Sequence, residues 1–155
     1  MARRPTLFGR PADWPAQDLV AFSAEFDEAL VLAGYTEGVF PMPLHESAFS
    51  QMGWWSPLRR GVLTPDGLRV TRSLRQSAKR YTTTIDTAFE QVLLACAEPS
   101  RPYGWIDQQI IRVYTALHRA GRVHSVETWD ADGRLVGGLY GVGLGGLFAG
   151  ESMFH

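Results

Sequence analysis

The segment 59–80 concentrates basic side chains, because seven of the fifteen lysines and arginines lie in it and Asp66 is its single acidic residue. The seven are Arg59, Arg60, Arg69, Arg72, Arg75, Lys79 and Arg80. Such a cluster supplies the positive surface that neutralises nucleic-acid phosphates. It would hold a phosphate backbone rather than read bases, because phosphate contacts carry little sequence information. The alternative is a solvated basic face without a partner.

Glu151 places a carboxylate within the otherwise apolar run 147–154. A carboxylate buried in such a strand is costly unless it is paired, hydrogen-bonded or used in chemistry. Two interpretations stay open. Glu151 is either a functional acid or a residue on the alternate, solvent-facing side of its strand.

The other polar motifs argue against several common chemistries. Residues 141–146 match G-x-G-x-x-G formally, but a strand is expected after them where a dinucleotide-binding loop needs a helix. His124 and Ser125 are adjacent in an expected strand and point to opposite faces, which excludes a triad with Glu127. The histidines show no metal-ligand spacing with one another or with Cys96, so no metal is expected.

Helices and strands alternate in the first part of the chain, which predicts an α/β or α+β fold. Helices are expected over 24–34, 73–80, 87–98 and the residues between Asp107 and Gly121, and short strands over 68–71 and 81–85. Ser23, Asp86 and Asp107 are the expected N-caps, and Gly34 and Gly121 the expected stops. Residues 38–57 are expected to form an irregular loop, rich in Met and Trp, that either packs on the core or faces a ligand.

After Gly121 the pattern changes to three strands, over 123–129, 135–142 and 147–154, which form an antiparallel meander. The run Pro-Ser-Arg-Pro-Tyr-Gly at 99–104 suggests a domain boundary. We therefore predict a small α/β domain over 1–100, carrying the basic cluster, and a second domain over 101–155.

The bulk composition excludes several classes of protein. The net charge of −1 is not that of a uniformly basic nucleic-acid binder, so any such surface must be local. The single cysteine, Cys96, lies in an apolar run and is expected to be buried. The N-terminus has no apolar signal segment, and 135–150 is too short and glycine-rich to span a membrane. These features predict a cytoplasmic protein without membrane association.

Seven short motifs occur in series. They are Gly-Val-Phe-Pro at 38–41, Trp-Trp-Ser-Pro at 54–57, Arg-Ser-Leu-Arg at 72–75, Trp-Ile at 105–106, His-Ser-Val-Glu at 124–127, Leu-Val-Gly-Gly-Leu-Tyr-Gly at 135–141 and Gly-Glu-Ser-Met-Phe at 150–154. In this order and spacing they resemble the bacterial leucyl/phenylalanyl-tRNA–protein transferase family, from about Leu32 to the end of the chain.

The resemblance implies an aminoacyltransferase. Members of that family move leucine or phenylalanine from aminoacyl-tRNA to the N-terminal arginine or lysine of acceptor proteins, which marks these proteins for N-degron degradation. The implied fold joins a small N-terminal α/β domain to an acyltransferase domain similar to the GNAT enzymes. No cofactor is expected, because aminoacyl-tRNA is already an activated ester and the enzyme mainly positions it.

The resemblance also assigns roles to residues. The aromatic side chain at Trp105 would hold the terminal adenosine, and the carboxylate at Glu151 would lie at the aminoacyl ester. Leu139, Phe148 and Met153 would line the pocket for the leucine or phenylalanine side chain, with methionine as a further possible substrate. Met42 would contribute to adenosine binding, although family members commonly carry tryptophan there. The basic cluster would seat the tRNA acceptor end.

Family members continue past the motif at 150–154, with an Asp-x-Gln element proposed for catalysis. We therefore expect a C-terminally truncated member with an incomplete GNAT-like domain. Two alternatives remain. One is a catalytically inactive fragment that binds tRNA or peptide. The other is an acyl-CoA N-acetyltransferase, which would need a pyrophosphate-binding loop ahead of a helix.

Overall fold

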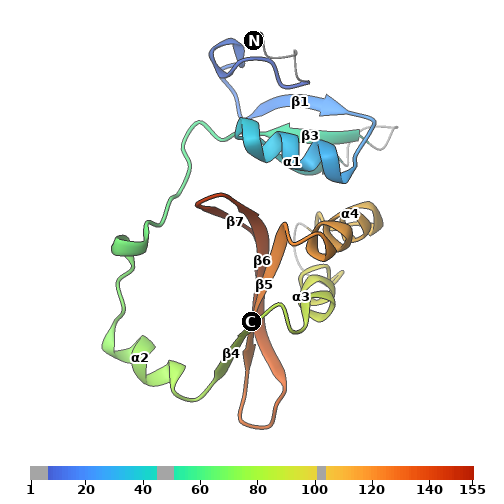
Figure 1. Ribbon diagram of the computed structural model, residues 1–155. Helices are drawn as coiled ribbons and strands as arrows, with labels where there is room; N and C mark the ends of the chain where they lie inside the picture. The colour runs from blue at the N-terminus through green and yellow to red at the C-terminus, as the bar shows by residue number, and fades with distance from the viewer. Residues whose placement is uncertain (1–6, 45–50, 101–103) are drawn as a thin grey trace. The chain divides into compact units, whose positions relative to one another are not determined.

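The computed structural model describes residues 7–44, 51–100 and 104–155. The chain separates into two compact units, Met1–Gly61 and Val62–His155 (Figure 1). The mixture of helices and antiparallel sheets confirms the predicted α/β or α+β class. The predicted boundary at residue 100 falls inside the second unit, next to residues 101–103, which lie outside the described residues.

The first unit is a three-stranded antiparallel sheet with one helix. Its strands are β1 (Leu19–Ser23), β2 (Phe40–Leu44) and β3 (Gln51–Trp55), in the order β1-β3-β2. A 3-10 turn, η1 (Pro11–Asp13), precedes them, and the helix α1 (Glu28–Glu37) joins β1 to β2. The prediction of an irregular loop over 38–57 was wrong for residues 40–44 and 51–55, which form the central pairing of this sheet.

Helix α1 begins four residues later than predicted. Its N-cap is Asp27, whose carboxylate accepts a hydrogen bond from the backbone N–H of Leu30 at 2.8 Å. Its C-cap is Gly38 in the left-handed conformation, with φ at 94°. Ser23 and Gly34 therefore do not cap it. Gly34 lies within the helix, and a Cβ there would come within 2.7 Å of the Trp54 ring.

Trp54 is the centre of the first unit's core. It is fully buried, its ring packs edge-on against Phe8 at 5.0 Å, and its indole N–H donates to the Ser23 hydroxyl at 2.9 Å. Met52 is also buried. Of the two interpretations for the Met- and Trp-rich segment, packing onto the core therefore holds for these two side chains.

The second unit contains a four-stranded antiparallel sheet and three helices. The strands are β4 (Thr82–Ile85), β5 (Val123–Trp129), β6 (Leu135–Leu144) and β7 (Leu147–Phe154), in the order β4-β5-β6-β7. The helices are α2 (Arg72–Ala78), α3 (Phe89–Cys96) and α4 (Gln108–Arg119), preceded by a 3-10 turn, η2 (Pro65–Gly67). The meander, the strand over 81–85 and the helices near 73–80, 87–98 and after Asp107 are confirmed. The predicted strand over 68–71 was wrong, because those residues are exposed and unpaired.

Helices α3 and α4 cover one face of this sheet (Figure 1). The buried residues Val123, Ser125 and Glu127 of β5 face them, as do Tyr140 and Val142 of β6. We call this the helix face. The opposite face carries the alternate residues of each strand, and we call it the outer face. The side-chain alternation of β5 follows from the strand pattern in the sequence.

Two caps in the second unit test the sequence predictions. Asp107 accepts from the backbone N–H of Ile110 at 2.9 Å, and Gly121 follows α4 with φ at 66°, as predicted. Asp86, by contrast, does not cap α3, whose N-cap is Ala88 without a side-chain hydrogen bond. Cys96 is buried within α3, as expected.

Candidate functional site

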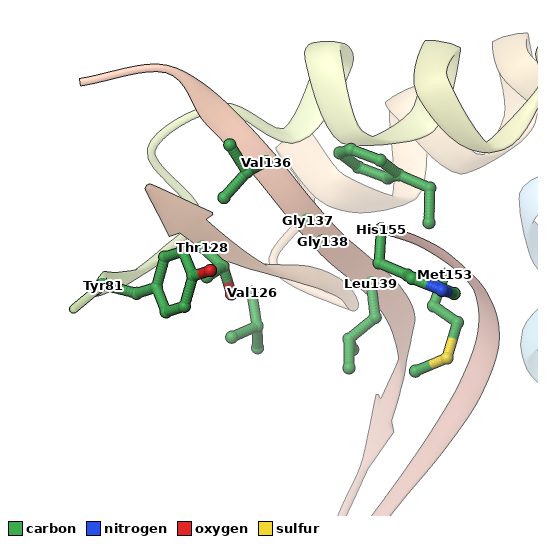
Figure 2. A pocket seen from close by; sticks show the side chains of 10 residues that line it. Tyr81, Val126, Thr128, Val136, Gly137, Gly138, Leu139, Met153 and His155 are labelled. Atoms are coloured by element: carbon green, nitrogen blue, oxygen red, sulfur yellow. The ribbon is translucent and has the colours of Figure 1, made fainter. Parts of the chain in front are cut away.

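An apolar pocket opens on the outer face of the second sheet. It has a volume of about 500 Å³. Leu139 of β6 pairs with Val126 of β5 on one side and with Met153 of β7 on the other, and all three line it. Figure 2 shows these three side chains projecting from the same side of the sheet. The structure thus brings together two of the three residues predicted to hold an apolar side chain, Leu139 and Met153.

A β-bulge at Glu151 determines which β7 side chains reach this face. Ser152 and Gly150 oppose the neighbouring residues Tyr140 and Gly141 of β6, so Glu151 is the extra residue that the bulge inserts into β7. The bulge changes the alternation of β7. As a result, Phe148, which pairs with Gly143, lies on the same face as Met153. The third predicted pocket residue therefore shares the outer face.

Gly141 provides the space that Phe148 needs. A Cβ at position 141 would lie 2.6 Å from the Cζ of Phe148 and would clash with the carbonyl oxygen of Ala149. Such contacts leave no room for a side chain at this position. The Phe148 ring therefore lies down on the sheet beside the row formed by Val126, Leu139 and Met153.

Glu151 itself is directed towards the helix face. It is half-buried, and the Tyr114 hydroxyl of α4 donates a hydrogen bond to its Oε2 at 3.3 Å. The Glu151 carboxylate is therefore hydrogen-bonded, which lowers the cost of its partial burial. Its predicted role at an ester stays a prediction.

Tyr140 lies beside this pair with its hydroxyl buried. Its ring packs edge-on against Tyr114 at 5.7 Å. Within the described parts of the chain, the Tyr140 hydroxyl is the buried side-chain polar atom that has no hydrogen-bond partner. Burial raises the pKa of Tyr140 strongly, and the nearby charge of Glu151 raises it further. The Tyr140 phenol is therefore neutral.

A second buried carboxylate, Glu127, organises the junction between β4 and α3. It is fully buried and accepts from the hydroxyls of Ser125, Thr84 and Thr87 and from the backbone N–H of Ala88. Burial is the largest single effect and raises the pKa of Glu127, but these hydrogen bonds together lower it below its usual value. Glu127 is thus an ionised carboxylate satisfied by hydroxyl and amide donors.

Asp86 and His124 form a pair that the sequence reasoning missed. Asp86 Oδ2 lies 2.7 Å from His124 Nδ1, and Asp86 Oδ1 accepts from the backbone N–H of Ser125 at 2.8 Å. Burial raises the pKa of Asp86, but the hydrogen bonds from His124 and Ser125 and the charges of His124 and His118 lower it overall. The rejection of a triad is confirmed, because Ser125 faces Glu127 on the helix face while His124 lies on the outer face.

The basic cluster is exposed but divided between the two units. Arg59 and Arg60 belong to the first, where Arg60 donates to the carbonyl oxygen of Gly38 at 3.2 Å and lies 5.6 Å from the centre of the Phe40 ring. The other five belong to the second unit, and they are Arg69, Arg72, Arg75, Lys79 and Arg80. Positions 72, 75 and 79 follow a helical spacing along α2 and its C-cap.

The two residues predicted to hold adenosine lie in different units. Met42 is on β2, half-buried, and its carbonyl oxygen accepts from the Trp55 indole at 3.4 Å. Trp105 is half-buried in the segment before α4. Their roles stay predictions.

Comparison with known proteins identifies the relatives of this chain. Residues 62–155 match the profile of the leucyl/phenylalanyl-tRNA protein transferase family, and residues 24–58 match the profile of that family's N-terminal domain. The chain belongs to the leucyl/phenylalanyl-tRNA protein transferase family. The second matched region begins at residue 62, where the second compact unit begins, and the first ends at residue 58, within the first unit.

Three relatives, each described as a leucyl/phenylalanyl-tRNA–protein transferase, illustrate the match. The protein of Aromatoleum aromaticum is 45% identical, over 97% of this chain and 66% of its own length. The protein of Pectobacterium carotovorum is 46% identical, over 88% of this chain and 57% of its own length. The protein of Anaeromyxobacter dehalogenans is 42% identical, over 97% of this chain and 65% of its own length. The chain therefore spans slightly less than two thirds of the length of these relatives. No helix in its described part is long and apolar enough to cross a membrane.

Proposed function

We propose that this chain is an aminoacyltransferase that moves leucine or phenylalanine from aminoacyl-tRNA to the N-terminal arginine or lysine of acceptor proteins. The observation that carries the proposal is the apolar outer-face pocket within the region that matches the family. Leu139 and Met153 line it, and Phe148 lies beside it on the same face. Marking of the products for N-degron degradation in the cytoplasm is part of the same proposal.

The pocket supports selection of an apolar side chain. Met153 is 57% exposed and Phe148 is 46% exposed, so both have surface that a leucine or phenylalanine side chain would bury. Such a pocket separates substrates that differ by one methylene by only about 1–3 kcal/mol. Leucine, phenylalanine and methionine would therefore all enter it.

Charge placement supports binding of the tRNA end. The exposed basic side chains along 69–80 would neutralise phosphates, Arg59 and Arg60 would add to them, and Trp105 and Met42 would contact the terminal adenosine. We assign Glu151 to the aminoacyl ester. Because Tyr114 holds the Glu151 carboxylate on the side of the helices, and β7 is an edge strand of the sheet, Glu151 would act on the ester from this edge and not from within the pocket.

The test is transfer of labelled leucine from Leu-tRNA to a peptide that begins with arginine, with a peptide that begins with glutamate as the matched control. Transfer to the arginine peptide alone supports the proposal. Binding of Leu-tRNA without transfer would instead support the alternative, a tRNA- or peptide-binding chain without catalysis. Absence of both binding and transfer would contradict both.

A further inference from the structure

The His124–Asp86 pair is a candidate acid–base group on the outer face. The two side chains are 2.7 Å apart at Nδ1 and Oδ2, and the His124 side chain is 37% exposed. An ionised carboxylate can only accept hydrogen bonds, so Nδ1 carries the proton in this contact. The neutral imidazole then presents a lone pair at Nε2. A carboxylate that fixes the tautomer in this way is the arrangement that makes histidine a directed proton acceptor.

The backbone of Asp86, which places its carboxylate against His124, has an uncommon conformation. Its φ is 57°, the one positive value at a non-glycine residue in the described parts of the chain. Its N–H donates to the Ser125 carbonyl at 3.1 Å. On either side of it, Thr84 and Thr87 donate to the buried Glu127. Such a conformation persists where surrounding contacts impose it, and here they place the carboxylate against His124.

The His124 ring lies on the outer face, over Gly143 and two residues along β5 from the pocket residue Val126. A Cβ at Gly143 would be 3.1 Å from His124 Cδ2 and 3.4 Å from Nε2, so the ring extends over Gly143, the residue that pairs with Phe148. Val126, which lines the pocket, is two residues from His124 along β5, or about 7 Å. For His124 to act, the carbonyl group of a substrate whose side chain fills the pocket must lie at the Val126 end of the pocket.

Glu151 does not offer a proton acceptor on this face. Its carboxylate already accepts a hydrogen bond from Tyr114, on the side of the helices. His118 approaches from α4: its ring stacks on Phe89 at 4.0 Å, and its Nδ1 lies 2.9 Å from the Val123 carbonyl and 3.6 Å from Asp86 Oδ1. Of the two remaining described histidines near the pocket, His155 lines the pocket itself, and His124 is the one that a carboxylate orients and that lies over Gly143, the partner of Phe148.

We propose that His124, oriented by Asp86, accepts the proton of the attacking α-amine during aminoacyl transfer. The inference rests on the function proposed above. The amine nitrogen forms a bond to the ester carbonyl carbon, and its proton passes to His124 Nε2. The bond from that carbon to the 3′ oxygen of the tRNA then breaks, and the proton passes from Nε2 to the leaving oxygen. The products are an amide and a free 3′ hydroxyl, and His124 regains its neutral form.

The first test uses the full chain labelled with ¹⁵N-histidine and ¹³C-methyl methionine, titrated with the product-like peptide Phe-Arg-Ala-amide. The new amide N–H of this peptide stands where the attacking amine was. We expect the Met153 methyl and His124 Nε2 signals to move together, with Met52, which is buried in the first unit, unmoved as an internal control. A moving Met153 with an unmoved His124 would overturn the inference alone. If neither moves, the pocket assignment, and with it the proposed function, fails.

The second test is kinetic. A general base contributes about 10²–10⁴-fold to rate. His124→Ala should therefore lower single-turnover transfer at least about 100-fold, with peptide affinity changed little and the rate partly restored by added imidazole. His124→Asn retains a donor towards Asp86 but lacks Nε2, and it should be as slow as His124→Ala. Normal transfer by His124→Asn would show that the pair is structural and contradict the inference, whereas no transfer by the unsubstituted chain would contradict the proposed function.

Discussion

Phe148 and Met153 face the same side of the sheet although their positions differ by five. Strict alternation along β7 would place them on opposite faces. The bulge at Glu151 removes this conflict, because it inserts one residue between the stretch that includes Phe148 and the stretch that includes Met153. The same bulge turns the Glu151 carboxylate towards Tyr114. One irregularity of the backbone thus assembles the apolar row and positions the acid.

Truncating Met153 should weaken binding of a phenylalanine side chain. Met153→Ala removes apolar surface that the ligand would cover, which is worth about 1–3 kcal/mol, or roughly a 10- to 100-fold loss of affinity for Phe-Arg-Ala-amide. Leu147→Ala is the matched control, because Leu147 is 51% exposed on the same strand but not among the pocket residues. Isothermal titration measures both. Equal losses in the two variants would place the ligand elsewhere.

Two glycines allow a matched test of the strand packing. Gly141→Ala should destabilise the second unit by about 1–3 kcal/mol, since its Cβ meets the Phe148 ring and the backbone of Ala149. Gly150→Ala should change stability little, because nothing lies within 4 Å of a Cβ there. Urea unfolding gives the free energy of unfolding of the two variants, and hydrogen exchange of the β6 and β7 amides shows whether the loss lies in these strands. A neutral Gly141→Ala would show that Phe148 does not rest on that position.

Much of the second unit could be predicted from sequence because its signals are local. The meander follows from alternating apolar residues between glycine turns, and α4 follows from its apolar spacing between Asp107 and Gly121. The first unit was less predictable. Prolines at positions 41 and 43 suggested a loop, yet both lie in β2, an edge strand, where a missing N–H is tolerated.

The apolar residues of the candidate site could be predicted from the sequence, but the Asp86–His124 pair could not. Leu139, Phe148 and Met153 came from the motif resemblance, and the bulge that unites them has no sequence signal of its own. The pairing of Asp86 with His124 joins residues far apart in sequence and depends on a positive φ at an aspartate. In the sequence, an aspartate directly before a helical pattern indicates an N-cap. In the structure, the register of β4 on β5 places Asp86 against His124 instead.

The salt dependence of tRNA binding tests the basic cluster. Arg72→Ala and Arg75→Ala should each lower affinity and reduce the slope of log K against log salt by about 0.7–0.9 for every phosphate that the side chain had neutralised. Arg134→Ala is the control, because Arg134 is already paired with Asp130 and Asp132 in the β5–β6 turn. Filter binding at several salt concentrations gives the slopes. If Arg72→Ala and Arg75→Ala leave the slope unchanged, α2 does not contact tRNA phosphates and is a solvated basic face.

The buried carboxylate Glu127 should make the second unit sensitive to acid. Its hydrogen bonds lower its pKa in the folded state, so its stabilisation is fully present above the ordinary glutamate pKa and is lost as pH falls through the lowered folded value. We expect stability to decline below about pH 5. Asp86, whose pKa is also lowered, should contribute in the same direction.

Glu127→Gln should reduce this acid sensitivity, because an amide keeps one acceptor but does not titrate. Glu127→Ala should cost at least about 2 kcal/mol at neutral pH, since the Ser125, Thr84 and Thr87 hydroxyls lose their shared acceptor. Thermal unfolding between about pH 2 and about pH 8, which covers the ordinary glutamate pKa and the lower values expected in the folded state, measures both effects. An unfolding profile of Glu127→Gln with the same pH dependence as the unsubstituted chain would show that another group carries the acid sensitivity.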